Sequence, residues 1–579
     1  MRNRVVLALA GAVCLGAVPG ISAYARQKHA AHVREFQKQL AGDQKILQAL
    51  NRLTYGPRPG DVQEVKSMGL KKWIDGQLHP ENTPENPVLT EKLKTLDTLE
   101  MSGAELVRNY PTPQMVRQMV NGQLPFPTDP DRKLMLTKLM ERYEQRQAQG
   151  GDAAAAPNMA NGKGLSGLVS AQQLRSLRQG TAQQRLAAFQ ALPRETQDEA
   201  IGAMPQGLRQ GLFALAPPEL RRRIAMANGP QQMVARDLTE GKLLRAVYSN
   251  RQLDEVLTDF WFNHFNIYLD KGADRYLVTA YERDVIRPHV LGKFKDLLEA
   301  TAKSPAMLFY LDNWQSVGPD APLARGKQGA GGKKAARGLN ENYGRELLEL
   351  HTLGVDGGYT QADVTEAARC FTGWTIVQPQ RGGAFAFNQR VHDDGEKTVL
   401  GVKIAKGGGM SDGEKVLDMV AHHPATARFI AQKLAMRFVA DEPPAALVDR
   451  MAETFRKTDG DLRAVMKTML ESKEFFSQGA YLGKLKSPLE VVASAVRVAN
   501  GAVDYAFPLA NQVAQLGEPL YRKQEPTGYS NSSREWLNAG GLVARMNFAL
   551  QLADNKIPGV RVEGSGAGIA LGSPEFQKR

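Results

Sequence analysis

The sequence predicts a mostly α-helical protein: one large multi-helix domain with a small β-hairpin element and with helical and low-complexity insertions. Apolar residues recur at a spacing of three or four over most of the chain, which is typical of helices. Only residues 384–404 alternate in the manner of strands. The chain has 579 residues, of which 42% are hydrophobic, so it is long enough to bury a sizeable core.

Residues 1–25 have the pattern of a secretory signal peptide. Arg2 and Arg4 precede an almost continuous apolar run over residues 5–18, and Ala23-Tyr24-Ala25 resembles a cleavage site. An uncleaved N-terminal anchor is the alternative interpretation. No later run is long and apolar enough for a membrane helix. We therefore expect a mature chain without a transmembrane span, located in the periplasm or secreted.

The sequence contains two cysteines, and Cys14 lies within the predicted signal peptide. The mature chain then keeps only Cys370, which excludes an internal disulfide and a cysteine-rich metal site. The formal net charge is +13, and removal of the signal peptide would lower it to +11. This charge is spread along the chain. It favours acidic partners only weakly and does not predict a nucleic-acid site.

Residues 26–147 form the N-terminal helical part of the main domain in this interpretation, and residues 148–235 form a linker followed by an insertion of short helices. Pro193, Pro205 and Pro217 recur every twelve residues in the insertion. Each proline can stand in the first turn of a helix, where its missing N–H group has no partner to lose. A chance spacing of helix starts is the alternative to a true internal repeat.

Residues 236–556 are predicted to be the helical core, interrupted by a mobile basic loop at 317–337. The β element near 384–404 is expected to turn at Asp394-Gly395, a common hairpin dipeptide. Residues 557–579 are glycine-rich and are predicted to be a flexible tail.

Two histidines fall on apolar helix faces. His264 lies in the apolar stripe of a helix predicted over 253–268, and His351 projects to the apolar side of a helix predicted over 339–353. An imidazole in such a place needs a hydrogen-bond partner or a metal ion. Both residues are therefore candidate ligands of a divalent metal, or candidate acid/base groups. A core histidine bonded to a carbonyl or a carboxylate is the alternative.

The polar face of the 339–353 helix carries Glu341, Arg345 and Glu349 at intervals of four residues. One guanidinium could then bridge both carboxylates. Arg345 and Glu349 are candidates for orienting the histidines. A solvated salt-bridge face is the alternative.

His392 stands in a third polar cluster, His392-Asp393-Asp394-Gly395-Glu396-Lys397. An imidazole and three carboxylates around a tight turn could bind a hard cation or a sugar, with a polar hairpin tip as the alternative. In the leading hypothesis His392 closes the site from the hairpin. The motifs of elbow-type serine hydrolases, zincins and dinucleotide-binding enzymes do not occur in the sequence.

Several stretches together resemble the bacterial family catalogued as "domain of unknown function 1800". They are Asn51–Gly60, Asp259–Phe265, Leu339–Gly354, Phe371–Trp374, His392–Lys397 and Pro526–Tyr529. The chain departs from the family pattern at Gly344, where members usually carry alanine. The resemblance implies an exported, mostly helical protein, often encoded beside exported sulfatase-like proteins, which are candidate partners. It also implies that His264, Arg345, Glu349, His351 and His392 belong to recurrent motifs.

Two hypotheses follow. The first is an envelope enzyme, metal-dependent or using His/Glu acid–base chemistry, with its site between the helices that carry His264 and His351. The second is a non-catalytic envelope module that binds an acidic glycan, another envelope polymer or a partner protein. Convergence of His264, His351 and Glu349 around a pocket would favour the enzyme.

Overall fold

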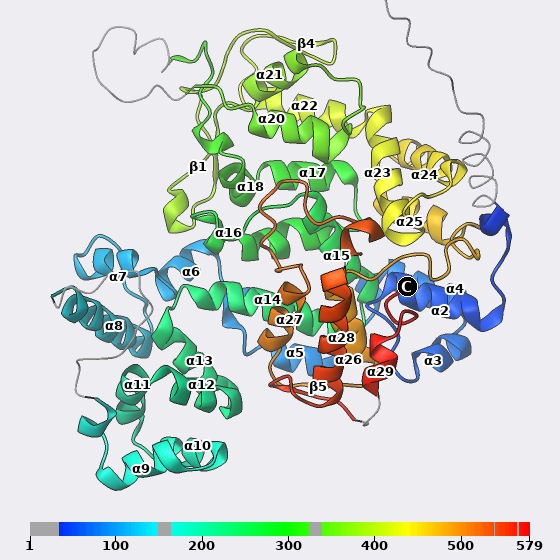
Figure 1. The fold of residues 1–579 in the computed structure, drawn as a ribbon. Coiled ribbons are helices and arrows are strands. Elements are labelled where there is room, and N and C mark those ends of the chain that lie inside the picture. Colours follow the sequence, from blue (N-terminus) through cyan, green and yellow to red (C-terminus); the bar gives the residue numbers. More distant parts are fainter. Residues whose placement is uncertain (1–33, 149–163, 323–337, 538, 564–566) are drawn as a thin grey trace, which may run out of the picture.

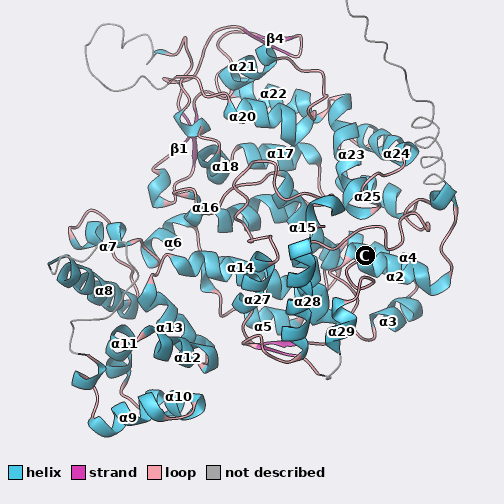
Figure 2. Ribbon diagram, in the orientation of Figure 1, coloured by secondary structure: helices cyan, strands magenta, loops and turns pink. Residues whose placement is uncertain are grey.

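The computed structural model describes residues 34–148, 164–322, 338–537, 539–563 and 567–579. Helices dominate these residues, and the strands form three small antiparallel pairs, as Figures 1 and 2 show. The mostly α-helical fold is confirmed. None of the described helices combines the length and the apolar character needed to cross a lipid bilayer. The predicted signal peptide and most of the predicted loop 317–337 lie outside the described residues.

The N-terminal part is a series of helices separated by glycine and proline turns. These helices are α2 (Gly42–Leu53), α3 (Asp61–Met68), α4 (Leu70–Leu78), α5 (Pro87–Leu93), α6 (Gly103–Asn109), α7 (Pro113–Val120) and α8 (Pro130–Ala148). The turn after α2 contains Gly56, with a φ of +97°. A Cβ atom there would lie 2.8 Å from the Cβ of Ser494, so only glycine allows this turn to approach the later helix α26 (Pro488–Val498).

The next helices pack around a small hydrophobic core of their own, built from Leu177, Phe189, Ile201 and Leu212 among others. They are α9 (Ala171–Gln179), α10 (Ala182–Gln190), α11 (Arg194–Ala203), α12 (Gln206–Leu215) and α13 (Pro218–Asn228). With α7 and α8 they lie to one side of the other helices, at the lower left of Figure 1.

The three regularly spaced prolines precede helices within this group. Pro193, Pro205 and Pro217 occupy the N-cap positions of α11, α12 and α13. The first-turn placement expected from the sequence is thus off by one residue.

Helix α15 (Gln252–His264) lies at the centre of the main body, and nearly every one of its residues is buried. Its neighbours in sequence are α14 (Gln232–Tyr248), α16 (Asp274–Ala280), η4 (Tyr281–Ile286), α17 (Phe294–Ala302) and α18 (Pro305–Tyr310). A helix buried on all sides must satisfy its polar side chains inside the protein. Asp259, Asn263 and His264 therefore need partners from other elements.

The helix predicted over 339–353 consists of a short α-helix, α20 (Asn342–Glu346), and a wider π-helical turn, η7 (Leu347–Thr352). The Leu353 N–H donates to the Leu348 carbonyl at 2.9 Å, which is an i to i+5 bond. Helix α20 packs closely on α21 (Gln361–Cys370). A Cβ on Gly344 would lie 2.9 Å from the Val364 carbonyl oxygen, so the glycine supports this approach.

The β element differs from the prediction in its pairing. Strand β2 (Phe385–Phe387) pairs with β1 (Trp374–Ile376), while β3 (Lys397–Val399) pairs with β4 (Val402–Ile404). The β3–β4 hairpin turns at Leu400 and Gly401, which both have positive φ. Asp394-Gly395 precedes β3 instead, so the expected turn at that dipeptide is wrong.

The C-terminal half continues as α22 (Ser411–Ala421), α23 (Pro424–Phe438), α24 (Ala445–Lys457), α25 (Leu462–Leu470), α26 (Pro488–Val498), α27 (Phe507–Gln515), α28 (Ala539–Ala553) and α29 (Ala567–Gly572). A third strand pair joins β5 (Ala502–Val503) to β6 (Val560–Arg561).

The tail after residue 557 is packed in its described part, contrary to the flexible tail that we predicted. Helix α29 lies on α28, and Arg579 is 3% exposed. The Arg579 N–H donates to the Lys484 carbonyl at 2.8 Å. The glycines of this segment therefore do not prevent it from joining the core.

Candidate functional site: a polar pocket beside two buried histidines

His264 and His351 lie together, as the leading hypothesis requires. Their ring centroids are 6.3 Å apart, and both residues are almost fully buried. The His264 Nε2 lies 3.0 Å from the His351 carbonyl oxygen. Because a carbonyl only accepts, His264 carries its proton on Nε2 and its buried Nδ1 is an acceptor without a partner. The contact is thus one side chain bonded to one backbone group.

Both imidazoles are held neutral. Burial, with a smaller effect of the partly buried Lys433, keeps the pKa of His264 well below its usual range and lowers that of His351 to about 3. Burial also lowers the pKa of Lys433, on α23, to about 8. The rings of Trp261 and Phe265 pack edge-on against His264. This surrounding favours uncharged groups.

A metal centre is not assembled here. Within the described ranges, no three His, Cys, Asp or Glu side chains are placed to hold a metal ion together. His264 and His351 supply two imidazoles, whereas catalytic zinc sites use three protein ligands. One His264 nitrogen is already bonded to a carbonyl. The donor set therefore does not fit a divalent metal.

Arg345 and Glu349 lie apart from the two histidines. Arg345 pairs with Glu341 at 3.3 Å and with the Gln361 side chain at 2.8 Å. Glu349 accepts a hydrogen bond from the Tyr359 hydroxyl at 3.1 Å instead. The expected bridge from Arg345 to both carboxylates fails because the π-helical turn η7 changes the four-residue spacing from residue 347 onward.

His392 belongs to a separate charge cluster, in which every member except the partly exposed Arg369 is buried. Its Nδ1 lies 2.7 Å from the Thr372 carbonyl oxygen, and its Nε2 lies 3.4 Å from Asp412 Oδ2. Lys397 donates to the same Asp412 oxygen at 2.9 Å, and Arg369 donates to Asp393 at 2.9 Å. The side chains of this cluster bind one another across the β3–β4 hairpin, and neither His264 nor His351 is among the partners of His392.

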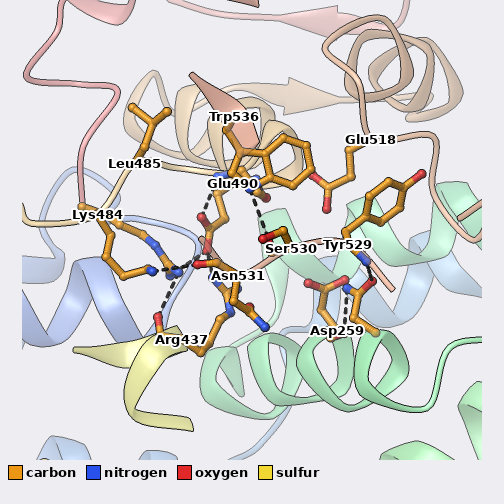
Figure 3. A pocket seen from close by; sticks show the side chains of 13 residues that line it. Asp259, Arg437, Lys484, Leu485, Glu490, Glu518, Tyr529, Ser530, Asn531 and Trp536 are labelled. Atoms are coloured by element: carbon orange, nitrogen blue, oxygen red, sulfur yellow. Dashed lines mark hydrogen bonds and ion pairs between the residues drawn. The ribbon is translucent and has the colours of Figure 1, made fainter. Parts of the chain in front are cut away.

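A cavity lined by many ionisable groups lies beside another face of α15. We call this cavity of about 20 Å³ the polar pocket; Figure 3 shows it from close by. It is lined by Asp259, Asn263, Arg437, Lys484, Leu485, Ser487, Glu490, Glu518, Tyr529, Ser530, Asn531, Trp536 and Arg579. Glu518 and Asp259 lie at one side of the view, and Lys484 and Arg437 lie at the other.

Two family-like motifs form one wall of the polar pocket. The Tyr529 N–H donates to the Asn263 side-chain oxygen at 3.1 Å, so the stretch Pro526–Tyr529 docks on α15. Gly528 makes this docking possible: its φ is +67°, and a Cβ atom there would lie 2.1 Å from the Asn263 carbonyl oxygen. Any larger residue would push the two motifs apart.

The two glutamates of the pocket are held in opposite protonation states. Burial, reinforced by the nearby Asp259, raises the pKa of Glu518 to about 8, and Glu518 accepts the Leu489 N–H at 2.8 Å. Burial alone would also raise the pKa of Glu490, but Arg437 and Arg579 lower it to about 2. At neutral pH Glu518 therefore keeps its proton while Glu490 is ionised.

Cations outnumber ionised carboxylates around Glu490. Arg579 contacts Glu490 at 2.6 Å, and Arg437 forms a second ion pair with the same oxygen. Lys484 pairs with Asp441 at 2.5 Å, yet burial and Arg579 lower its pKa to about 7. Arg52, from the first family-like motif, lies fully buried beside them and donates to the Val439 carbonyl at 3.1 Å. The pocket is thus short of negative charge.

Sequence reasoning missed this pocket. Glu518 and Lys484 lie in loops that contain no recognisable motif. Asp259 lies in the family-like stretch Asp259–Phe265 but was not predicted to be a site residue. One signal was available, because Asp259 and Asn263 are four residues apart on the same predicted helix. Residues four apart on a helix lie on the same face, so these two polar side chains point in the same direction.

Comparison with known proteins gives one family. The chain matches the family described as "Protein of unknown function (DUF1800)" over residues 48–577, which is nearly its whole length. Neither a search of curated proteins nor a search of solved structures gave a match. The resemblance inferred from the motifs is confirmed.

Proposed function

We propose that this chain, which belongs to the DUF1800 family, is an exported cell-envelope enzyme that carries out acid–base chemistry in the polar pocket. The observation that carries the proposal is Glu518, a buried carboxyl group with a pKa raised to about 8 in the same pocket as Asp259. A carboxylic acid that keeps its proton at neutral pH can donate it to a leaving group.

The reaction class that fits the pocket is hydrolysis. A cavity of about 20 Å³ has room for one water molecule. Lys484, whose pKa is lowered to about 7, lies across the pocket from Glu518 and can accept a proton from that water. In this scheme the water oxygen bonds to the electrophilic carbon of the scissile link while the bond from that carbon to the departing oxygen breaks. The water proton passes to the neutral Lys484 amine, and the Glu518 proton goes to the departing oxygen.

The proposed substrate is an anionic polymer of the cell envelope. Arg437, Lys484 and Arg579 line the pocket and would attract negative charge. Ser530 is exposed and Trp536 is partly buried, and entry to the pocket would take place on their side. The proposal of export to the periplasm or the cell exterior is supported by the signal-peptide pattern of residues 1–25.

A second candidate is a non-catalytic envelope module that binds a partner protein, such as the sulfatase-like proteins that the family resemblance suggests. One observation favours it: helix α28 exposes a stripe of Leu542, Val543, Met546 and Leu550, each between 44% and 58% exposed. Apolar side chains gathered on one helix face are typical of an interface.

Both candidates can be separated by assaying purified mature protein on polygalacturonate and on chondroitin sulfate for release of reducing ends. The enzyme hypothesis predicts cleavage by the wild type and a rate about 100-fold lower for Glu518→Gln. Glu535→Gln, an exposed residue near the pocket, serves as the control and should keep the wild-type rate. Equal rates for wild type and Glu518→Gln would refute the proposed acid. Absence of cleavage by the wild type would refute the enzyme hypothesis and leave the non-catalytic module.

A further inference from the structure

A second cavity lies where the short-helix group meets the main body. We call it the arginine pocket; its volume is about 60 Å³. Phe213 on α12 and Arg221 on α13 line it from one side, and Arg236 and Glu240 on α14 and Tyr505 line it from the other. It is three times the volume of the polar pocket, which is enough for a small oxyanion in place of several waters.

Arg236 presents an unpaired guanidinium to this cavity. The group lies over the rings of Phe507 at 4.2 Å, Phe213 at 4.7 Å and Tyr505 at 5.7 Å. Across the described residues, Arg236 makes no ion pair and donates no hydrogen bond to another protein group. Stacking on aromatic rings fixes the plane of a guanidinium while its N–H groups stay available. Arg236 is therefore a preoriented set of donors.

Two further groups point to the same ligand. The Tyr505 hydroxyl is buried and has no hydrogen-bond partner, although the residue is 8% exposed. The Arg221 guanidinium lies 4.9 Å from the centre of the Tyr505 ring, and its Nε donates a hydrogen bond to the Ala216 carbonyl. Its terminal nitrogens form no ion pair within the part of the chain that the structure describes. Buried polar groups normally have partners, so an orphaned hydroxyl beside two such guanidiniums needs an explanation.

The carboxylates near the cavity do not neutralise these arginines. Asp237 is engaged by Arg222 at 2.9 Å, and Asp504 is engaged by Arg561 at 3.0 Å. Glu240 accepts the Ala506 N–H at 2.9 Å, and burial raises its pKa to about 7. Two guanidiniums therefore face one carboxyl group that is only partly ionised at neutral pH.

We propose that the arginine pocket binds a phosphate group, held by Arg236, Arg221 and the Tyr505 hydroxyl. Phosphate suits the site because its oxygens can accept from two forked guanidiniums and a hydroxyl at once. The ligand would join Arg221 of the short-helix group to Arg236 of the main body. Phosphate binding would consequently tie the two parts of the molecule together.

Titration calorimetry of the whole mature protein with inorganic phosphate tests the proposal, with sodium chloride at matched ionic strength as the blank. The wild type should bind phosphate saturably, at about one site per chain. Arg236→Gln should weaken binding by at least about tenfold, and Tyr505→Phe should weaken it by about threefold to tenfold. Arg175→Gln, an exposed position on α9, is the matched control and should bind as the wild type does.

Tyr505→Phe removes only the hydroxyl group and should therefore fold. It provides the test of the site if Arg236→Gln does not fold. Arg236→Lys retains the charge but loses the forked geometry, and it should bind more weakly than the wild type. Absence of saturable binding by the wild type would overturn the proposal. Unchanged affinity in folded Arg236→Gln and Tyr505→Phe would overturn it as well.

Discussion

Two regions beside helix α15 differ in the charge states of their buried ionisable side chains. At its C-terminal end, His264 and His351 lie among aromatic rings and are held neutral. On another face, Asp259 and Asn263 open on a pocket in which Glu490 is ionised between two arginines while Glu518 keeps its proton. The histidine region has the properties of a core, whereas the polar pocket has the charged and tunable groups that chemistry requires.

The largest expected effect comes from Glu490→Gln, which leaves Arg437 and Arg579 without their shared carboxylate. Removing one member of a buried ion cluster costs about 3–5 kcal/mol, because the remaining charges stay buried. Urea unfolding at pH 7 measures the loss. Glu471→Gln, on an exposed side chain, should change the unfolding free energy little. A small effect of Glu490→Gln would mean that the pocket is not held by this cluster.

Glu518 should make stability depend on pH in a definite direction. The native protein holds the Glu518 proton up to a pKa of about 8, whereas the unfolded chain releases it near its ordinary value. The unfolded state thus binds fewer protons between these values, and the wild type should lose about 2–4 kcal/mol as the pH rises from about 4.5 to 8.

Glu518→Gln should remove that part of the pH dependence. Denaturant unfolding of both proteins at pH 5, 6.5 and 8 gives the difference. If the two curves run parallel, Glu518 does not carry the raised pKa.

Gly528→Ala should separate the motif Pro526–Tyr529 from α15 and cost about 2–3 kcal/mol, since its Cβ would meet the Asn263 carbonyl and its φ of +67° is strained. Gly122→Ala is the matched control: its φ of +71° is nearly the same, but nothing lies within 4 Å of the added Cβ. Thermal unfolding should show a clearly larger loss for Gly528→Ala. Equal losses would assign the whole effect to backbone strain.

His264→Phe should cost only about 1 kcal/mol, because it removes one hydrogen bond to the His351 carbonyl and keeps an aromatic ring in the core. The change should be the same at pH 6 and pH 8, since His264 stays neutral over that range. Loss of all activity in a stably folded His264→Phe protein would move the chemistry from the polar pocket to the histidine region.

The smallest effect is expected from metal removal. Dialysis against EDTA should leave the thermal midpoint within about 1 °C, because no three ligating side chains converge in the described chain. A shift of several degrees, reversed by zinc, would require a metal site that His264 and His351 help to build.

Sequence periodicity was sufficient to predict the helices and the burial of His264 and His351, because both depend on the spacing of nearby residues. It was insufficient wherever partners are distant in the chain. Glu518 and Lys484 meet α15 across more than two hundred residues, and no local pattern records such a contact. The strand pairing was mispredicted for a different reason: Phe385–Phe387 pairs with the preceding segment Trp374–Ile376, which shows no strand-like alternation in the sequence.

The family-like motifs helped more than their individual side chains suggested. Arg345, Glu349 and His392 do not contact the histidine pair. They are bonded instead to Glu341, Tyr359 and Asp412, respectively. Asp259, Asn263 and Tyr529 come from two different motifs and do converge. The motifs therefore indicated which segments meet, although the chemistry lies on residues that were not singled out.

The π-helical turn η7 makes chain length, more than residue type, the sensitive variable in the stretch 347–352. Deleting one residue there would restore an ordinary α-helix and change the direction in which the residues of the turn face. His351 would then turn its carbonyl away from His264. Insertions and deletions should therefore be far rarer in this buried stretch than in the surface turns of the same protein.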